Sequence, residues 1–436
     1  MMLRLLVFCL LFLLPVRVLA APADLPSRCF VCAAASEAAY SGELPELLRA
    51  RLAAAGWQIA SYETPGYKGT VGRFFHMVRT DEDGTETHLI AFPGTERGSD
   101  VWTDLRLGRV AFGGDSPAEF LAVRDMRVTE RSETPLVHRG FLDYTQAALF
   151  TDVLPAYGNR TAGEVLAAEL RAHPSMRIYL TGHSLGGAAA VLAAARLSDL
   201  GVAPEQLVVT TFGAPAVGNA AFVRRYEGRF TLHRVVMSGD PMKDVLAAPL
   251  GFQQFGERVP WSPARSVAKF PHAMMVYVDA AIRQVYDAYG GDNAFLFLMG
   301  LPNRTEGRTL YALPIETELD DTLAEDAPYM TAVLRDALHV RNAAVVCAAS
   351  GGGLSEDYLL SGLEGHLAAA RAAGAEQMVA YRIAGAKERT AHETCRVTLE
   401  RAVYDMDGNL LAATSRSART GTLTPIGTVL YLFAQD

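Results

Sequence analysis

The stretch Arg177-Ile-Tyr-Leu-Thr-Gly-His-Ser-Leu-Gly-Gly-Ala-Ala-Ala190 decides the fold. It predicts a short apolar strand, a glycine-rich turn and a long alanine-rich helix. Within it, Gly182-His183-Ser184-Leu185-Gly186 fits the pattern G-x-S-x-G, in which a tight strand-to-helix turn lifts the serine hydroxyl out of the sheet. The helix that follows directs its unpaired N–H groups and positive dipole end at the serine. We therefore interpret Ser184 as a nucleophile and the N–H of Leu185 as an oxyanion donor. The alternative, a glycine-rich strand–helix turn with an incidental serine, is less consistent with this context.

The composition indicates a globular protein with a large core. Of the 436 residues, 50% are hydrophobic and 20% are charged. This is enough chain for one large domain with a smaller one, or for two of middle size. The formal net charge of −8 and the absence of a basic stripe argue against a nucleic-acid partner. An anionic membrane surface would mildly repel the same charge, so we expect contact with lipid to be apolar.

The first twenty residues have the pattern of an export signal. Arg4 supplies a positive charge, residues 5–14 form an apolar run, and Val18-Leu19-Ala20 suits a signal peptidase. The run is too short for a comfortable membrane span. We predict a signal peptide over residues 1–20 and a secreted or periplasmic mature protein.

Export leaves an even number of cysteines in an oxidising compartment. Once Cys9 is removed with the signal, the chain retains Cys29, Cys32, Cys347 and Cys395. We predict disulfides among them, and of the three possible pairings the simplest joins Cys29 to Cys32 and Cys347 to Cys395. A redox role for the C-x-x-C pair lacks the βαβ context that it needs, and zinc lacks a second Cys or His pair at finger spacing. We therefore favour structural staples.

Strands and helices alternate through the middle of the chain. Strands are expected over residues 72–79, 87–92, 206–212 and 230–237, and helices over 37–55 and 161–173. Such alternation predicts an α/β fold with a mostly parallel sheet and flanking helices. Ligand chemistry in these sheets lies at the carboxyl ends of the strands, where Thr95, Ser184 and Asp240 fall.

Five short blocks occur in a characteristic order: Phe92-Pro-Gly-Thr95, Trp102-Thr-Asp-Leu105, His138-Arg-Gly-Phe141, Gly182-His-Ser-Leu-Gly-Gly187 and Phe212-Gly-Ala-Pro215. Together they resemble the class 3 lipases, fungal triacylglycerol lipases and related phospholipases with an α/β-hydrolase-type fold. The likeness covers about residues 59–280 and implies a Ser–Asp–His triad in that chain order. By this resemblance Ser184 matches the nucleophile and Asp240 the acid. It further assigns Thr95 and Leu185 as the two oxyanion residues, and Trp102 and Leu105 as two lid residues.

The histidine has several candidates. In this chain order the base follows Asp240, which leaves His272, His339, His366 and His392. We favour His272 because it stands just ahead of a closing helix, where the family often has its histidine, although its spacing from Asp240 is shorter than in the fungal enzymes. Asp244 is the alternative acid, further from the strand end. We interpret His183 as a packed orienting residue.

The resemblance fades after about residue 286, and the chain divides there. Residues 316–328 are acid-rich and indicate a linker. Residues 329–436 predict a small α+β domain, with helices at 329–339 and up to 373, and strands at 343–348, 378–383 and 395–404. We therefore predict a signal peptide (1–20), an α/β-hydrolase-type domain (21–315), an acidic linker (316–328) and a C-terminal α+β domain (329–436). That last domain could bind an unidentified partner, a substrate or an envelope component.

These residues predict a serine carboxylic-ester hydrolase that needs no metal or organic cofactor. His272 would take the proton of Ser184 as it attacks an ester carbonyl, while Asp240 holds the imidazole. The substrate would be a lipid or another ester, met at a lipid–water interface. Triacylglycerol lipase, phospholipase A1 and short-chain esterase activity all stay open. The alternative from another class is a non-catalytic envelope binding protein on a hydrolase scaffold, and the intact Ser, Asp and His set weighs against it.

Overall fold

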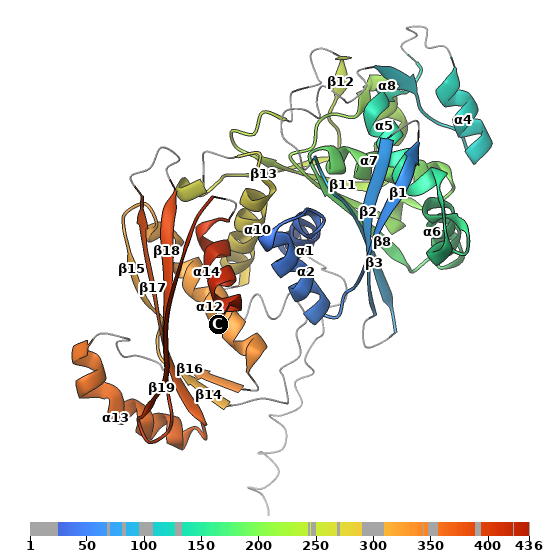
Figure 1. The fold of residues 1–436 in the computed structure, drawn as a ribbon. Helices are drawn as coiled ribbons and strands as arrows, with labels where there is room; N and C mark the ends of the chain where they lie inside the picture. Colours follow the sequence, from blue (N-terminus) through green and yellow to red (C-terminus); the bar gives the residue numbers. More distant parts are fainter. Residues whose placement is uncertain are drawn as a thin grey trace, which may run out of the picture.

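A seven-stranded sheet carries the elements around Ser184 (Figure 1). The computed structural model describes residues 25–67, 70–80, 84–95, 108–126, 133–242, 245, 250–267, 271–289, 309–342, 344–347, 356–388, 394–421 and 423–435. The strands lie in the order β1 (Gln58–Tyr67), β2 (Thr70–Thr80), β3 (Glu86–Phe92), β8 (Arg177–His183), β9 (Leu207–Phe212), β11 (Thr231–Met237) and β13 (Glu257–Trp261). The first two pairings are antiparallel, and the four from β3 to β13 are parallel. The predicted mostly parallel α/β sheet is confirmed.

Helices cover both faces of this sheet, which explains why its central strands β8 and β9 are buried along almost their whole length. On one face, Ile178 and Leu180 of β8 share a core with the helices α5 (Arg139–Thr145), α6 (Ala162–Ala172) and α7 (Leu185–Asp199). On the other face, Tyr179 shares a core with α1 (Leu25–Ala38), α2 (Glu43–Ala54) and α10 (Met274–Tyr289). Successive strand residues point to opposite faces, so the two cores alternate along β8.

The helix α1 was not predicted. The expected helix began at residue 37, whereas the structure starts one at Leu25 and packs it against the sheet. The Ser36 hydroxyl lies 2.9 Å from the Thr181 hydroxyl on β8, and the Ser27 hydroxyl lies 2.8 Å from that of Tyr289 on α10. The residues just after the expected signal peptide therefore form a central layer of the molecule.

A second, six-stranded sheet follows in the C-terminal part. Its strands are β14 (Thr309–Ala312), β15 (Glu316–Leu319), β16 (Ala344–Cys347), β17 (Gln377–Lys387), β18 (Cys395–Tyr404) and β19 (Leu410–Arg419). They are accompanied by α12 (Ala327–Arg341), α13 (Glu356–Ala372) and α14 (Pro425–Ala434). Figure 1 shows α1 and α2 between the two sheets, and one hydrophobic cluster runs from Phe30 through Tyr277 to Ile426.

The acidic linker expected at residues 316–328 is wrong, because a strand begins there. Residues Glu316–Leu319 form β15, which pairs in parallel with β17. The second sheet also includes β14, so it begins by Thr309 rather than at residue 329. The acidic side chains of β15 are compatible with a strand because its pairing uses the backbone and much of its surface stays exposed. The division into separately folding domains stays a prediction.

The predicted disulfides are also wrong, since none joins the four described cysteines. Cys347 lies on β16 and Cys395 on β18, with β14 and β17 between them. Three strand spacings amount to roughly 14 Å, beyond the ~7 Å between Cα atoms that a disulfide spans. Cys29 and Cys32 lie one turn apart inside α1, and burial raises the pKa of the Cys32 thiol to about 11. That thiol is therefore protonated and unreactive.

Smaller elements complete the described part of the chain. Four short strands form a sheet in the order β12 (Phe252–Gln253), β10 (Gly218–Asn219), β5 (Leu136–His138) and β4 (Arg109–Ala111). The pair β6 (Val153–Leu154) and β7 (Arg160–Thr161) stands apart. The remaining helices are α4 (Pro117–Asp125), α8 (Ala220–Tyr226), the π-helix η1 (Gln146–Thr151) and short 3₁₀ turns at Pro155–Tyr157, Pro204–Gln206, Arg265–Val267 and Ala324–Asp326. Among the helices that the structure describes, none has the length and hydrophobicity to cross a bilayer. The predicted signal peptide lies outside the described residues.

His138 caps α5 as a neutral side chain, which gives a testable pH dependence. The amide of Phe141 donates to His138 Nδ1 (3.3 Å), and burial lowers the pKa of this histidine from 6.5 to about 4. Between these two pKa values the unfolded chain binds about one proton more than the folded protein at this histidine. The free energy of unfolding therefore falls by about 1.4 kcal/mol for each pH unit of acidification. His138→Asn keeps a capping acceptor without the titration. We expect urea unfolding to give a slope of free energy against pH that is flatter by about 1.4 kcal/mol per unit between about pH 4.5 and 6. An unchanged slope would show that His138 does not exclude a proton on folding.

Candidate active site

Ser184 sits on a strained turn between β8 and α7. Its backbone has φ 55° and ψ −120°, a region that residues other than glycine rarely adopt, and its amide donates to the carbonyl of Phe212 (2.9 Å). The flanking glycines make the turn possible. A Cβ on Gly186 would lie 2.1 Å from the Phe92 carbonyl oxygen, and one on Gly182 would lie 2.3 Å from the Gly186 carbonyl carbon. The turn therefore holds the serine hydroxyl at the carboxyl edge of the sheet.

The structure brings Ser184, His272 and Asp240 together. Ser184 follows β8, Asp240 follows β11 on the other side of β9, and His272 stands just ahead of α10. The Ser184 Oγ lies 3.1 Å from His272 Nε2. The Asp240 oxygens Oδ1 and Oδ2 lie 3.0 and 2.9 Å from His272 Nδ1. These three side chains form one continuous hydrogen-bonded series from hydroxyl to carboxylate.

Asp240 is held as a buried carboxylate by several donors. Burial raises its pKa, but hydrogen bonds from His272 and Tyr277 lower it by more, so that the pKa lies below the ordinary value of 3.8. The amide of Met242 also donates to Oδ1 (2.8 Å). Tyr277, whose hydroxyl donates to Oδ2 from the first turns of α10, was missed by sequence reasoning. The one signal available was its position five residues after His272, at the start of the closing helix.

The two expected oxyanion residues lie at the same edge. Leu185 is the first residue of α7, so its amide is one of the unpaired N–H groups of the helix start. Thr95 ends the described loop after β3, the strand that pairs with β8 so that Phe92 faces Gly182. Trp102 and Leu105, the expected lid residues, lie outside the described residues.

The alternative site residues fall elsewhere or are not described. His339 lies on α12 and His366 on α13, both elements of the C-terminal part of the chain. Asp244 and His392 lie outside the described residues. Within the described part, no group of three or more His, Cys, Asp or Glu side chains is arranged to hold a metal ion.

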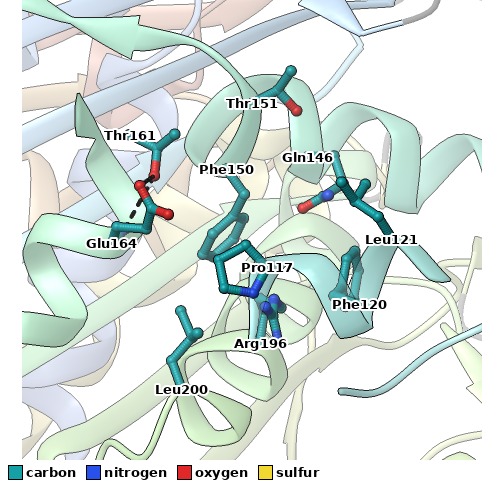
Figure 2. Close-up of a pocket in the computed structure, with 10 residues that line it drawn as sticks. All are labelled: Pro117, Phe120, Leu121, Gln146, Phe150, Thr151, Thr161, Glu164, Arg196 and Leu200. Carbon is teal, nitrogen blue, oxygen red and sulfur yellow. Dashed lines mark hydrogen bonds between the residues drawn. The ribbon is translucent and has the colours of Figure 1, made fainter. Parts of the chain in front are cut away.

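A cavity of about 180 Å³ lies at the other end of α7 (Figure 2). Half of the ten residues that line it are phenylalanine, leucine or proline, and Arg196 and Glu164 add charge. Because Arg196 stands eleven residues after Leu185, it lies roughly 17 Å further along the helix axis. The cavity is therefore separate from the series of Ser184, His272 and Asp240.

Comparison with known proteins identifies the class. Residues 89–248 match the family described as Lipase (class 3). A segment of 91 residues is 37% identical to toxin TseL of Vibrio cholerae, covering 21% of this chain and 12% of the relative. Another of 119 residues is 34% identical to a lipase of Rhizopus niveus, covering 27% of this chain and 28% of the relative. The chain thus spans less than a third of either curated relative. Among solved structures, lipase II from Rhizopus niveus aligns at 21% identity over 54% of this chain and 82% of its own, with a TM-score of 0.38.

Proposed function

We propose that this protein is an exported serine carboxylic-ester hydrolase that cleaves acyl esters of glycerolipids. The observation that carries the proposal is the hydrogen-bonded series from Ser184 through His272 to Asp240 at the carboxyl edge of the sheet. The family match supports it, as does the name lipase of the Rhizopus niveus relative. The export pattern of residues 1–20 supports a secreted or periplasmic location.

The arrangement would perform acyl transfer in two steps. His272 Nε2 takes the proton from Ser184 Oγ as the oxygen bonds to the ester carbonyl carbon, and then passes it to the leaving alcohol. Water hydrolyses the acyl-serine by the reverse proton path and releases the carboxylic acid. Asp240 stays ionised throughout and stabilises the imidazolium, as its lowered pKa requires.

The negative oxygen of each tetrahedral intermediate would be bound at the start of α7. The Leu185 amide points from the positive end of the helix, and Thr95 comes from the neighbouring strand end. Each such donor contributes about 10²–10³-fold to kcat. The remaining class alternatives, a phospholipase A1 and a short-chain esterase, use the same chemistry on a different substrate.

Covalent labelling tests the proposal directly. A fluorophosphonate should label the purified wild-type protein on the peptide that contains Ser184, and Ser184→Ala should abolish both labelling and ester hydrolysis. Ser198→Ala removes a buried serine from the far end of the same helix and should label like wild type. Turnover of triolein emulsion, phosphatidylcholine vesicles and a soluble short-chain ester distinguishes the three substrate classes. A folded wild-type protein that is neither labelled nor active on any of these substrates, even with detergent present, would instead support the alternative of a non-catalytic envelope binding protein.

A further inference from the structure

His183 links the strand that carries the nucleophile to the loop that carries the base. It is the last residue of β8, directly before Ser184, and its side chain is 6% exposed. Its Nε2 lies 2.7 Å from the backbone carbonyl oxygen of His272. Its Nδ1 lies 2.7 Å from the hydroxyl of Tyr40, which comes from the turn after α1.

The direction of both hydrogen bonds follows from their partners. A carbonyl oxygen can only accept, so His183 Nε2 carries a hydrogen and donates to His272. Burial, followed by the neighbouring His272, lowers the pKa of His183 to about 3, so the ring is neutral and its Nδ1 is an acceptor. The Tyr40 hydroxyl must therefore donate to Nδ1. With this single arrangement of protons, the Tyr40 hydroxyl, both His183 nitrogens and the His272 carbonyl all have a hydrogen-bond partner.

We propose that Tyr40 and His183 are positioning residues for the reaction proposed above. Tyr40 fixes His183 as its Nε2–H tautomer, and His183 in turn holds the backbone of His272 so that the imidazole reaches Ser184. The inference rests on the proposed role of Ser184 and His272, and it adds an N-terminal residue from outside the matched family region 89–248.

The site depends on the hydrogen bond from His183 because His272 lies in a loop and its side chain is partly exposed. Its side chain is 32% exposed, and its ring is hydrogen-bonded to Asp240 at Nδ1 and to Ser184 at Nε2. The turn at Ser184 is held by close backbone contacts at Gly182 and Gly186, so a hydrogen bond from the adjacent His183 limits how far the base can move. The rings of His183 and His272 pack with their centroids 4.6 Å apart.

The Tyr40 hydroxyl also lies against the oxyanion loop. A Cβ on Gly94 would lie 2.0 Å from this oxygen and 2.7 Å from the backbone oxygen of His183. Only glycine lets the loop that leads to Thr95 pass so close. One tyrosine of the N-terminal layer thus contacts both His183, which bonds to the backbone of the base, and the loop that leads to Thr95.

Tyr40→Phe tests the link, and the chain offers a matched control. Tyr157 makes a similar tyrosine–histidine contact, with its hydroxyl 2.7 Å from Nδ1 of His76 on β2, two strands away from β8. We expect Tyr40→Phe to lower kcat about 10-fold with KM changed less than about twofold, whereas Tyr157→Phe changes neither by more than about twofold. Equal kcat values in the two variants would overturn the proposal.

A second measurement needs neither activity nor the variant. Nitrogen-15 NMR of the wild-type protein should show His183 as the Nε2–H tautomer across the neutral range, and an Nδ1–H tautomer would overturn the proposal. His183→Gln keeps an amide donor near the Nε2 position and should retain more activity than His183→Leu; equal losses would also contradict it. An inactive, unlabelled wild-type protein with the expected tautomer would reject the ester hydrolase while leaving the hydrogen-bonded link supported.

Discussion

Replacing His272 by alanine is expected to lower kcat for ester hydrolysis by about 10⁶-fold. Under the proposed mechanism this imidazole removes the Ser184 proton and later protonates the leaving alcohol, so without it the hydroxyl is a poor nucleophile. The protein should remain folded, because the side chain is partly exposed and the strained turn at Ser184 does not depend on it.

Steady-state kinetics with a soluble ester, together with fluorophosphonate labelling of Ser184, measures this effect. His233→Ala is the matched control: His233 is another histidine beside a carboxylate, 3.3 Å from Glu257, but it is not joined to a serine in the site. It should keep wild-type kcat. Residual activity of His272→Ala within about 100-fold of wild type would move the base to His339, His366 or His392.

Replacing Gly213 by alanine is expected to lower kcat by about 10³-fold or more, because it displaces the acid of the series. Gly213 follows β9 with φ +55°, and a Cβ there would lie 2.5 Å from Asp240 Oδ2 and 3.2 Å from His272 Nδ1. The carboxylate would have to move, breaking its bond to the imidazole. The left-handed backbone adds a strain of about 1–2 kcal/mol to the folded state.

Gly228→Ala separates these two contributions. Gly228 also has a left-handed backbone, with φ +79°, but a Cβ there meets nothing within 4 Å. Thermal unfolding should show comparable destabilisation from strain in both variants, while kcat falls in Gly213→Ala alone. Equal kcat values would mean that the site tolerates a displaced Asp240, and the proposed role of that carboxylate would be wrong.

Local patterns account for what the sequence predicted correctly. The turn at Ser184 and strands β8, β9 and β11 are encoded in short stretches, where glycine positions and apolar runs are read directly. The helix α1 was missed because it is buried on nearly all sides, so its sequence has no amphipathic stripe to mark a helix. The strand β15 was missed because acidic, partly exposed residues resemble a linker when the pairing is invisible.

Contacts between distant segments lay beyond reach of the sequence. Whether Cys347 can meet Cys395 depends on the order of strands in a sheet, which composition and spacing do not encode. Tyr40, in the turn after α1, and Tyr277, on α10, come from either side of the family region. Their hydroxyls reach the site only once α1 and α10 pack against the sheet. Side chains that touch the reacting ester are easier to find by pattern than those that orient them.

The place of α1 also constrains how the protein is made. This helix leaves the ribosome first among the described elements, yet it packs on α10, and the Ser27 and Tyr289 hydroxyls that meet there are 262 residues apart. Contacts of such separation close late in folding. A growing chain therefore has to leave the side of α1 that packs on α10 uncovered until nearly two thirds of the protein has been synthesised. Because Tyr277 of α10 donates to Asp240, a nascent chain cannot complete the proposed catalytic site before α10 has emerged.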